Sequence, residues 1–138
     1  MKLVSRVLDA YSIITYLEGE AGKDRMIEVL KVARDTGRPL LLCVVNWGEV
    51  YYITLREAGQ ERANQVAHLL TTLPIEFVDV DMELAKKPAE LKATRKMSYA
   101  DCFAAALAKL RKAELVTGDK EFKQVEEALK ILWVTEPG

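Results

Sequence analysis

The run of residues from Leu40 to Val45 is apolar at every position, and this feature constrains the fold more than any other. A strand with one face in water alternates apolar and polar residues, whereas an uninterrupted apolar strand is covered on both faces, as in parallel sheets. Further strand-like runs alternate with helix-like segments along the chain: strands at 3–8, 40–45, 75–78, 114–117 and 131–134, and helices at about 10–17, 26–36, 46–57, 63–73, 82–95, 98–113 and 121–129. We therefore predict an α/β fold, a three-layer sandwich with a central, mainly parallel sheet and right-handed crossovers.

Length, charge and cysteine content exclude several classes of protein. The 138 residues fit one domain, 1–138, and no apolar run approaches the roughly 20 residues that a membrane span needs. The N-terminus carries no secretory signal, which predicts a cytoplasmic protein with Cys43 and Cys102 as reduced core thiols. The formal net charge of −1 gives no overall basic signature, so any polyanion must be contacted locally.

Four acidic residues lie at junctions between a predicted strand and the helix that follows it. Asp9 and Asp119 directly follow strands, and Glu49 and Asp101 lie in the first turns of helices. Parallel strands and the helices after them meet at one edge of the sheet, where open α/β sheets bind ligands. Ionised carboxylates about 4 Å apart repel by about 4 kcal/mol at an effective dielectric near 20, and a divalent cation would remove that repulsion. Oxygen ligands without a His or Cys set predict Mg²⁺ or Mn²⁺ rather than zinc.

Three of the four acids also have a purely structural explanation. Glu49 stands three residues after Asn46, which is the spacing of a capping box, and the last of the four acids could cap the helix that follows it. Asp101 has the same relation to Ser98. Asp9 has the least local reason to be present, because it ends a buried strand. Four independent caps would not need to lie at the same edge of one sheet, so the joint pattern favours a functional site.

These four motifs, in this order, resemble those of the PIN domain family, and in particular its VapC-type toxins. The resemblance covers nearly the whole chain and is carried by the segments Val7-Leu8-Asp9-Ala10, Asn46-Trp47-Gly48-Glu49-Val50, Ser98-Tyr99-Ala100-Asp101 and Val116-Thr117-Gly118-Asp119-Lys120-Glu121-Phe122. One departure is clear. Two residues after the first acid the family usually has Ser, Thr or Asn, whereas this chain has Tyr11, followed by Ser12.

The resemblance implies a Mg²⁺- or Mn²⁺-dependent endoribonuclease. Its catalytic residues and metal ligands, direct or through water, would be Asp9, Glu49, Asp101 and Asp119. Supporting roles would belong to Thr117, Glu121 and Ser12. The expected partners are an RNA substrate, a small antitoxin protein that covers the active-site groove, and a second copy of the chain in a homodimer.

A basic segment leads into the third motif, although a solvated helix face would explain it equally well. The candidates to contact RNA phosphates are Lys92, Arg95, Lys96 and Lys120. Tyr11 or Tyr99 could stack on an unpaired base, but packing in the core or at an interface is an alternative for both. The aromatic-rich helix around Trp47 and Tyr51 could expose an apolar face for a partner or could simply pack in the core.

Three other interpretations stay open. The chain could be a non-catalytic PIN-like module that binds RNA or acts as a scaffold, with acids that only cap helices. It could also be a housekeeping RNA-processing nuclease without a toxin role. An enzyme with an aspartyl nucleophile is less favoured, because no Asp-x-Asp motif follows the first strand. His68 is expected to be an ordinary helix residue.

Overall fold

Five strands form a single sheet in the order β3–β2–β1–β4–β5, and every pair of neighbouring strands is parallel. The computed structural model describes residues 4–19 and 21–135, and within them it confirms the predicted α/β fold. The strands are β1 (Arg6–Leu8), β2 (Leu40–Cys43), β3 (Ile75–Val78), β4 (Glu114–Thr117) and β5 (Ile131–Trp133). The helices are α1 (Ala10–Glu18), α2 (Lys23–Thr36), α3 (Val44–Thr72), α4 (Met82–Thr94), α5 (Tyr99–Leu110) and the 3-10 helix η1 (Lys120–Val125).

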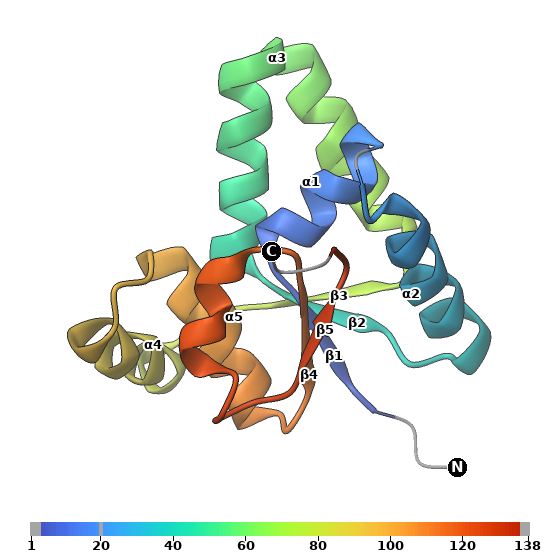
Figure 1. The fold of residues 1–138 in the computed structure, drawn as a ribbon. Coiled ribbons are helices and arrows are strands. Elements are labelled where there is room, and N and C mark those ends of the chain that lie inside the picture. Colours follow the sequence, from blue (N-terminus) through green and yellow to red (C-terminus); the bar gives the residue numbers. More distant parts are fainter. Residues whose placement is uncertain (1–3, 20, 136–138) are drawn as a thin grey trace.

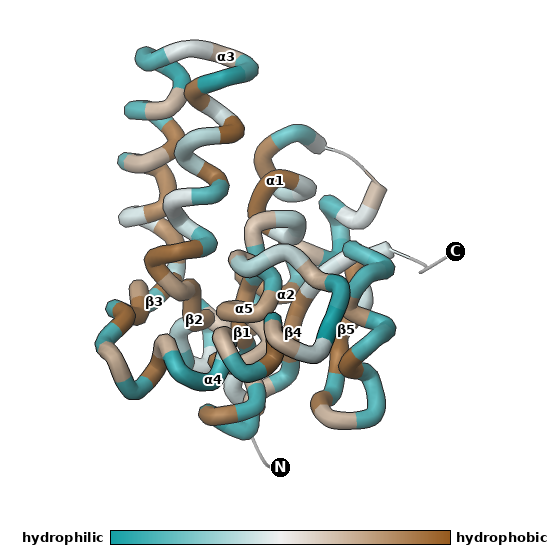
Figure 2. The backbone as a smooth tube through the Cα atoms, turned by 90° about the vertical axis from the view of Figure 1, so that its left-hand side faces the viewer, coloured by the Kyte–Doolittle hydropathy of each residue, from teal (hydrophilic) through white to brown (hydrophobic). Residues whose placement is uncertain are grey.

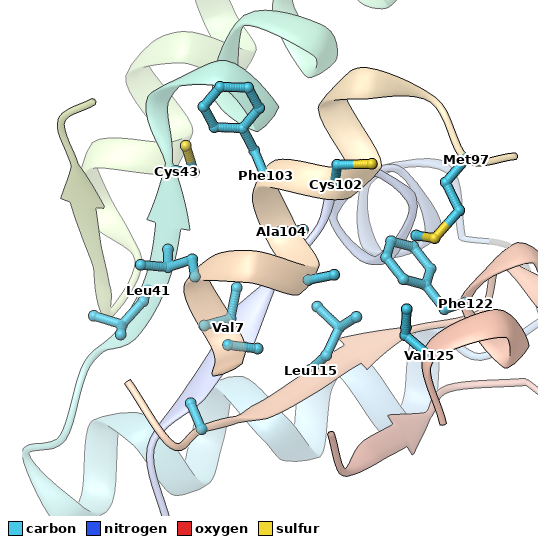
Figure 3. Close-up of a cluster of buried hydrophobic side chains, with 14 residues drawn as sticks. Val7, Leu41, Cys43, Met97, Cys102, Phe103, Ala104, Leu115, Phe122 and Val125 are labelled. Atoms are coloured by element: carbon cyan, nitrogen blue, oxygen red, sulfur yellow. The ribbon is translucent and has the colours of Figure 1, made fainter. Parts of the chain in front are cut away.

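Helices cover both faces of the sheet (Figure 1). Successive residues of a strand point to opposite faces, so adjacent residues of β1 enter different cores. Val7 packs in a cluster with Phe103 of α5 and Phe122 of η1, whereas Leu8 packs in a second cluster with Met26 of α2. Figure 3 shows the first cluster, in which strand side chains meet the small side chains of α5. The central strands are therefore buried on both sides, as their apolar sequences predict.

The long helix α3 is a hairpin of two helical arms. Gly59 separates the arms with a non-helical backbone (φ 89°, ψ 175°), at the position where the sequence predicts an interruption. Figure 1 shows the first arm projecting from the body of the molecule and the second arm returning to it. Figure 2 shows hydrophilic residues at the tip of this hairpin and apolar stretches in the sheet. None of the helices in the described ranges combines the length and apolar character that spanning a bilayer requires.

Several predicted boundaries differ from the structure. The strand predicted at 40–45 ends at Cys43, and Val44 already belongs to α3, because an apolar run alone does not distinguish a strand from a buried helical turn. The helix predicted to reach 113 ends at Leu110, shortly before Lys112 adopts a positive φ of 52°. The helix predicted at 121–129 is a 3-10 helix that ends at Val125. The strand predicted at 3–8 is observed from Arg6, and its first residue, Leu3, lies outside the described residues.

Candidate active site

The candidate site lies at the carboxyl edge of the sheet, above the central strands β1 and β4. After β1 the chain continues to β2 and β3 on one side of the sheet, and after β4 it continues to β5 on the other side. Ligand sites of open α/β sheets form at such a reversal of strand order. Asp9 follows β1 and Asp119 follows β4, while Glu49 lies near the start of α3 and Asp101 near the start of α5.

Asp9 is the most deeply buried of the four acids, with 1% of its surface exposed. Its side chain caps α1: Oδ1 accepts a hydrogen bond from the backbone N–H of Ser12 at 2.8 Å, and Oδ2 accepts one from the hydroxyl of Thr117. The Ser12 hydroxyl in turn donates to the Asp9 carbonyl oxygen at 3.0 Å. Burial outweighs these hydrogen bonds and raises the pKa of Asp9 to about 7.

Thr117 links the two acids that follow the central strands. It is fully buried, its hydroxyl donates to Asp9, and the same oxygen accepts from the backbone N–H of Asp119 at 3.0 Å. One hydroxyl thus holds the ends of β1 and β4 in a fixed relation. Ser12 and Thr117, to which the resemblance assigns supporting roles, both contact Asp9, and Thr117 also contacts Asp119.

Asp101 lies in the first turn of α5, where the expected capping box is present on the Ser98 side. The Ser98 hydroxyl accepts from the backbone N–H of Asp101 at 3.1 Å. Burial, together with the negative charges of Asp119, Asp9 and Glu49, raises the pKa of Asp101 to about 7. The other three acids are therefore close enough to act on Asp101, which is the convergence that the sequence predicts.

Three carboxylates form the tightest part of the cluster. Oxygen atoms of Asp101, Asp119 and Glu121 lie within 4.8 Å of one another, a spacing that a single cation could bridge. Asp119 also caps η1, where its Oδ1 accepts from the backbone N–H of Glu121 at 3.0 Å. Glu121, expected only as a supplementary acid, thus belongs to this trio, and Asp9 and Glu49 add negative charge from two further elements.

Asn46 is a site residue whose function the sequence did not reveal. It was expected to cap α3, but the helix begins two residues earlier and the Asn46 side chain instead reaches across to α5. Its Nδ2 donates to the carbonyl oxygen of Ala100 at 2.9 Å and, more weakly, to Glu49 Oε1 at 3.5 Å. Its Oδ1 is buried and has no hydrogen-bond partner among the described residues. Asn46 therefore links α3, which carries Glu49, to α5, which carries Asp101.

Burial raises the pKa of the Glu49 carboxyl above its ordinary value, and the hydrogen bond from Asn46 only partly offsets this effect. The charge of Asp119 adds to the increase. The donor set is made of carboxylate oxygens, and the negative charge of Asp119 contributes to the raised pKa values of Asp9, Glu49 and Asp101. A hard divalent cation fits such a set, since it would bind the ionised oxygens and cancel their repulsion.

The basic residues that were candidates to contact RNA occupy different places. Lys92 donates from Nζ to the carbonyl oxygen of Met97 at 2.8 Å, so it holds the segment that enters α5. Lys96 exchanges backbone hydrogen bonds with the side chain of Gln124. Arg95 faces a groove between α4 and α5, and Lys120 is the residue directly after Asp119.

Two exposed tyrosines lie beside the acids. Tyr11 is 42% exposed and Tyr99 is 49% exposed, and they stand two residues after Asp9 and two residues before Asp101. The Tyr11 ring leaves no room for a side chain at Gly118, because a Cβ there would lie 2.4 Å from Tyr11 Cε1. Cys43 and Cys102 are buried free thiols, as predicted.

A sequence model of the PIN domain matches residues 6–128. No curated protein matches the chain in a sequence comparison.

Solved structures share the fold at low sequence identity. A toxin-antitoxin complex from Klebsiella pneumoniae contains a chain with a TM-score of 0.72 and 16% identity, and the match covers 96% of this chain and 99% of that one. VapBC2 from Rickettsia felis, solved with a promoter DNA fragment, has a TM-score of 0.71 and 16% identity over 92% and 96% of the two chains. VapC20 from Mycobacterium tuberculosis, described as a sarcin-ricin loop cleaving toxin, has a TM-score of 0.70 and 15% identity over 88% and 95%.

Proposed function

Because the chain belongs to the PIN domain family, we propose that it is a divalent-metal-dependent endoribonuclease, the toxin of a VapBC-type toxin-antitoxin pair. The observation that carries this proposal is the convergence of carboxylates from four separate segments at one edge of the sheet. Caps alone would not require such convergence, and the mutual repulsion destabilises the metal-free protein. A bound cation would remove this repulsion, which gives the protein a reason to keep the acids together.

Asp9, Glu49, Asp101 and Asp119 would hold Mg²⁺ or Mn²⁺. Glu121 could add a further oxygen ligand, since it lies beside Asp101 and Asp119. When bound, such an ion lowers the pKa of coordinated water and neutralises the charge of a scissile phosphodiester. The protein's own residues keep the oxygens in place: Thr117 fixes Asp9 relative to Asp119, and Asn46 fixes Glu49 relative to α5. Because Asp9 and Asp101 have pKa values of about 7, cation binding near neutral pH would release protons from them.

RNA is the proposed substrate. Lys120 directly follows Asp119 in the chain, which makes it a candidate to contact a phosphate at the acids. Arg95 lines the groove between α4 and α5, Lys96 follows it in the chain, and Lys92 holds the segment that enters α5 through its hydrogen bond to Met97. The exposed rings of Tyr11 and Tyr99 offer faces on which unpaired bases could stack.

The proposed protein partners are a small antitoxin and a second copy of the chain. Solved structures with this fold include toxin-antitoxin complexes, which supports the antitoxin. The first arm of α3 exposes Tyr52 (51%) and Leu55 (37%), an apolar surface of the kind that partners cover.

Cleavage of an unstructured RNA by the purified chain tests the proposal. We expect Mn²⁺-dependent cleavage that EDTA abolishes and that Asp101→Asn reduces by at least about 100-fold, since it removes one charge from the metal site. Asp81→Asn is a matched control, because Asp81 also caps a helix but lies at α4 and Asn caps equally well. RNA binding without cleavage under all metal conditions would instead favour the non-catalytic module.

A further inference from the structure

A groove of about 560 Å³ lies between α4, α5 and η1, apart from the acidic cluster. Asp101 is in the first turn of α5, whereas Ala105, Ala106 and Lys109 line the groove further along the same helix. These residues lie about 6–12 Å beyond Asp101 along the helix axis, at 1.5 Å per residue. A molecule in the groove would therefore not need to contact the acids. Figure 1 shows the three elements on one side of the sheet.

The floor of the groove is apolar and aliphatic. Ala105 and Ala106 form its base, and because their side chains are small, the surface between the helices is hollow. Leu91 of α4 and Leu129, which follows η1, form the walls and are half-buried, and Leu110 at the end of α5 is 48% exposed. A volume of this size is typical of pockets that bind ligands or the side chains of a partner.

The rim of the groove is basic. Lys87 and Arg95 of α4 and Lys109 of α5 line it, and Glu90 is the acidic residue among its lining residues. Glu90 Oε1 lies 3.5 Å from Lys87 Nζ, so its charge is already paired with part of this rim. Positive charge is thus concentrated here although the chain as a whole carries a formal charge of −1. An acidic partner would be complementary to this rim.

The lining distinguishes between a nucleic acid and a peptide. None of the described residues that line the groove is aromatic, so they offer bases no stacking platform. A concave aliphatic floor adds nothing to the binding of phosphates, which need only an accessible basic surface. Both features suit an amphipathic helix, which buries aliphatic residues at helical spacing and keeps its charged residues at the edges of the groove.

From the apolar floor and the basic rim together, we propose that this groove binds an acidic amphipathic helical segment of a partner protein. Lys87 and Arg95 are eight residues apart on α4, a length of about 12 Å or about two helical turns. The segment would accordingly place leucine-like anchors at positions i, i+4 and i+7 over the Ala105–Ala106 floor. Its Asp or Glu residues would face Arg95 and Lys109. The inference does not depend on RNA cleavage.

A synthetic peptide tests this proposal on the full chain. The probe is a fluorescein-labelled helical peptide with Leu at i, i+4 and i+7 and Glu on both flanks, and a second peptide has every Glu replaced by Lys. We expect the acidic peptide to bind the protein at least about tenfold more tightly than the basic one, because the rim attracts only the former.

Three variants assign the binding to the groove. Arg95→Glu combined with Lys109→Glu replaces two positive charges of the rim with negative ones and should weaken acidic-peptide binding by at least about tenfold. Leu110→Ala removes an exposed apolar contact and should weaken it by about threefold or more. Lys86→Glu combined with Lys31→Glu makes the same change of charge outside the groove and should leave binding unchanged.

Several outcomes would overturn the proposal. Equal binding of both peptides, or no binding of either, would exclude an acidic partner. Binding that the Lys86→Glu and Lys31→Glu control weakens as much as the rim variant would reflect net charge alone. Loss of RNA binding, rather than of peptide binding, in the rim variant would assign the groove to nucleic acid. A change from dimer to monomer in that variant, measured by sedimentation, would assign it to a second copy of the chain.

Discussion

At the level of individual residues, the site consists of carboxylates whose burial is only partly compensated by hydrogen bonds. Thr117, Ser12 and Asn46 hold them in place, yet the pKa values of Asp9 and Asp101 still rise to about 7. An active site that concentrates like charges in this way is less stable than the same fold without them. Stability and the proposed function are therefore opposed at this edge of the sheet.

The first prediction concerns pH. In the unfolded chain, Asp9 and Asp101 lose their protons near pH 3.8, whereas in the folded protein they retain them up to about pH 7. Between these values the folded state binds more protons, so the stability contributed by the two groups falls as the pH rises toward 7. We expect the melting temperature of the metal-free protein to fall between about pH 5.5 and about pH 8.5, with a loss of about 2 kcal/mol attributable to Asp9. Asp101→Asn should give a shallower slope, and an equal or steeper slope would contradict the assignment.

The second prediction concerns the Thr117 hydroxyl. Thr117→Val keeps the shape of the side chain but leaves Asp9 Oδ2 and the Asp119 N–H without their shared partner. We expect the free energy of unfolding to fall by about 1–3 kcal/mol, as measured by urea denaturation. Thr117→Ser retains the hydroxyl and is the matched control, with an expected loss of about 1 kcal/mol or less for the missing methyl group. Equal losses of unfolding free energy in the two variants would mean that the hydrogen bonds of the Thr117 hydroxyl do not stabilise the protein.

At the level of helices and strands, the protein places its acids by means of helix starts. Asp9 and Asp119 cap the helical segments that follow them, and Asp101 lies in the first turn of α5, which Ser98 caps. The hairpin α3 differs, because its two arms depend on a single backbone position, Gly59.

The third prediction tests that position. The backbone of Gly59 has φ 89° and ψ 175°, a combination that is essentially restricted to glycine, although a Cβ there would meet nothing within 4 Å. Gly59→Ala should therefore destabilise the protein by about 1–3 kcal/mol through backbone strain alone. Gly48→Ala is the control on the same element, since a Cβ at Gly48 is equally free of contacts and Gly48 does not have a positive φ. It should stabilise the helix by up to about 1 kcal/mol in the same urea measurement. Similar effects of the two substitutions on stability would show that the turn between the arms of α3 does not require glycine at position 59.

The elements that could be predicted from the sequence are those with strong periodic patterns. The doubly covered strands β2 and β4 and the capped helix α5 follow directly from apolar runs and from Ser98. The end of β2 at Cys43 could not be predicted, because Val44 and Val45 suit a strand as well as a helical turn. The bridge from Asn46 to Ala100 joins segments 54 residues apart, and nothing local in the sequence indicates it.

For the whole molecule, the strand order explains why four distant segments share one site. The two central strands β1 and β4 are neighbours, and the chain leaves them toward opposite ends of the sheet. The acids could be predicted as a group because a parallel sheet brings the ends of its strands to one edge. The position of Glu121 in the tight trio could not, because it depends on how η1 turns after Asp119.

The fourth prediction concerns cation binding and the stability of the whole chain. A cation binds the ionised carboxylates, so Mn²⁺ should raise the melting temperature more at about pH 8.5 than at about pH 5.5. The difference should become smaller in the Asp9→Asn variant, which loses the most deeply buried of the ionisable groups at the site but retains Asp101. A stabilisation that is independent of pH would mean that Mn²⁺ binds elsewhere.

Calorimetric titration of Mn²⁺ into the folded protein at neutral pH tests most directly whether the converging acids form one metal centre. The comparison is between the wild type, the double variant Asp101→Asn with Asp119→Asn, and the control Asp81→Asn. We expect one class of sites in the wild type and in the control, and an affinity reduced by at least about tenfold in the double variant, with circular dichroism showing an intact fold. An unchanged Mn²⁺ affinity in the folded double variant would contradict the assignment of these carboxylates as the metal-binding active site.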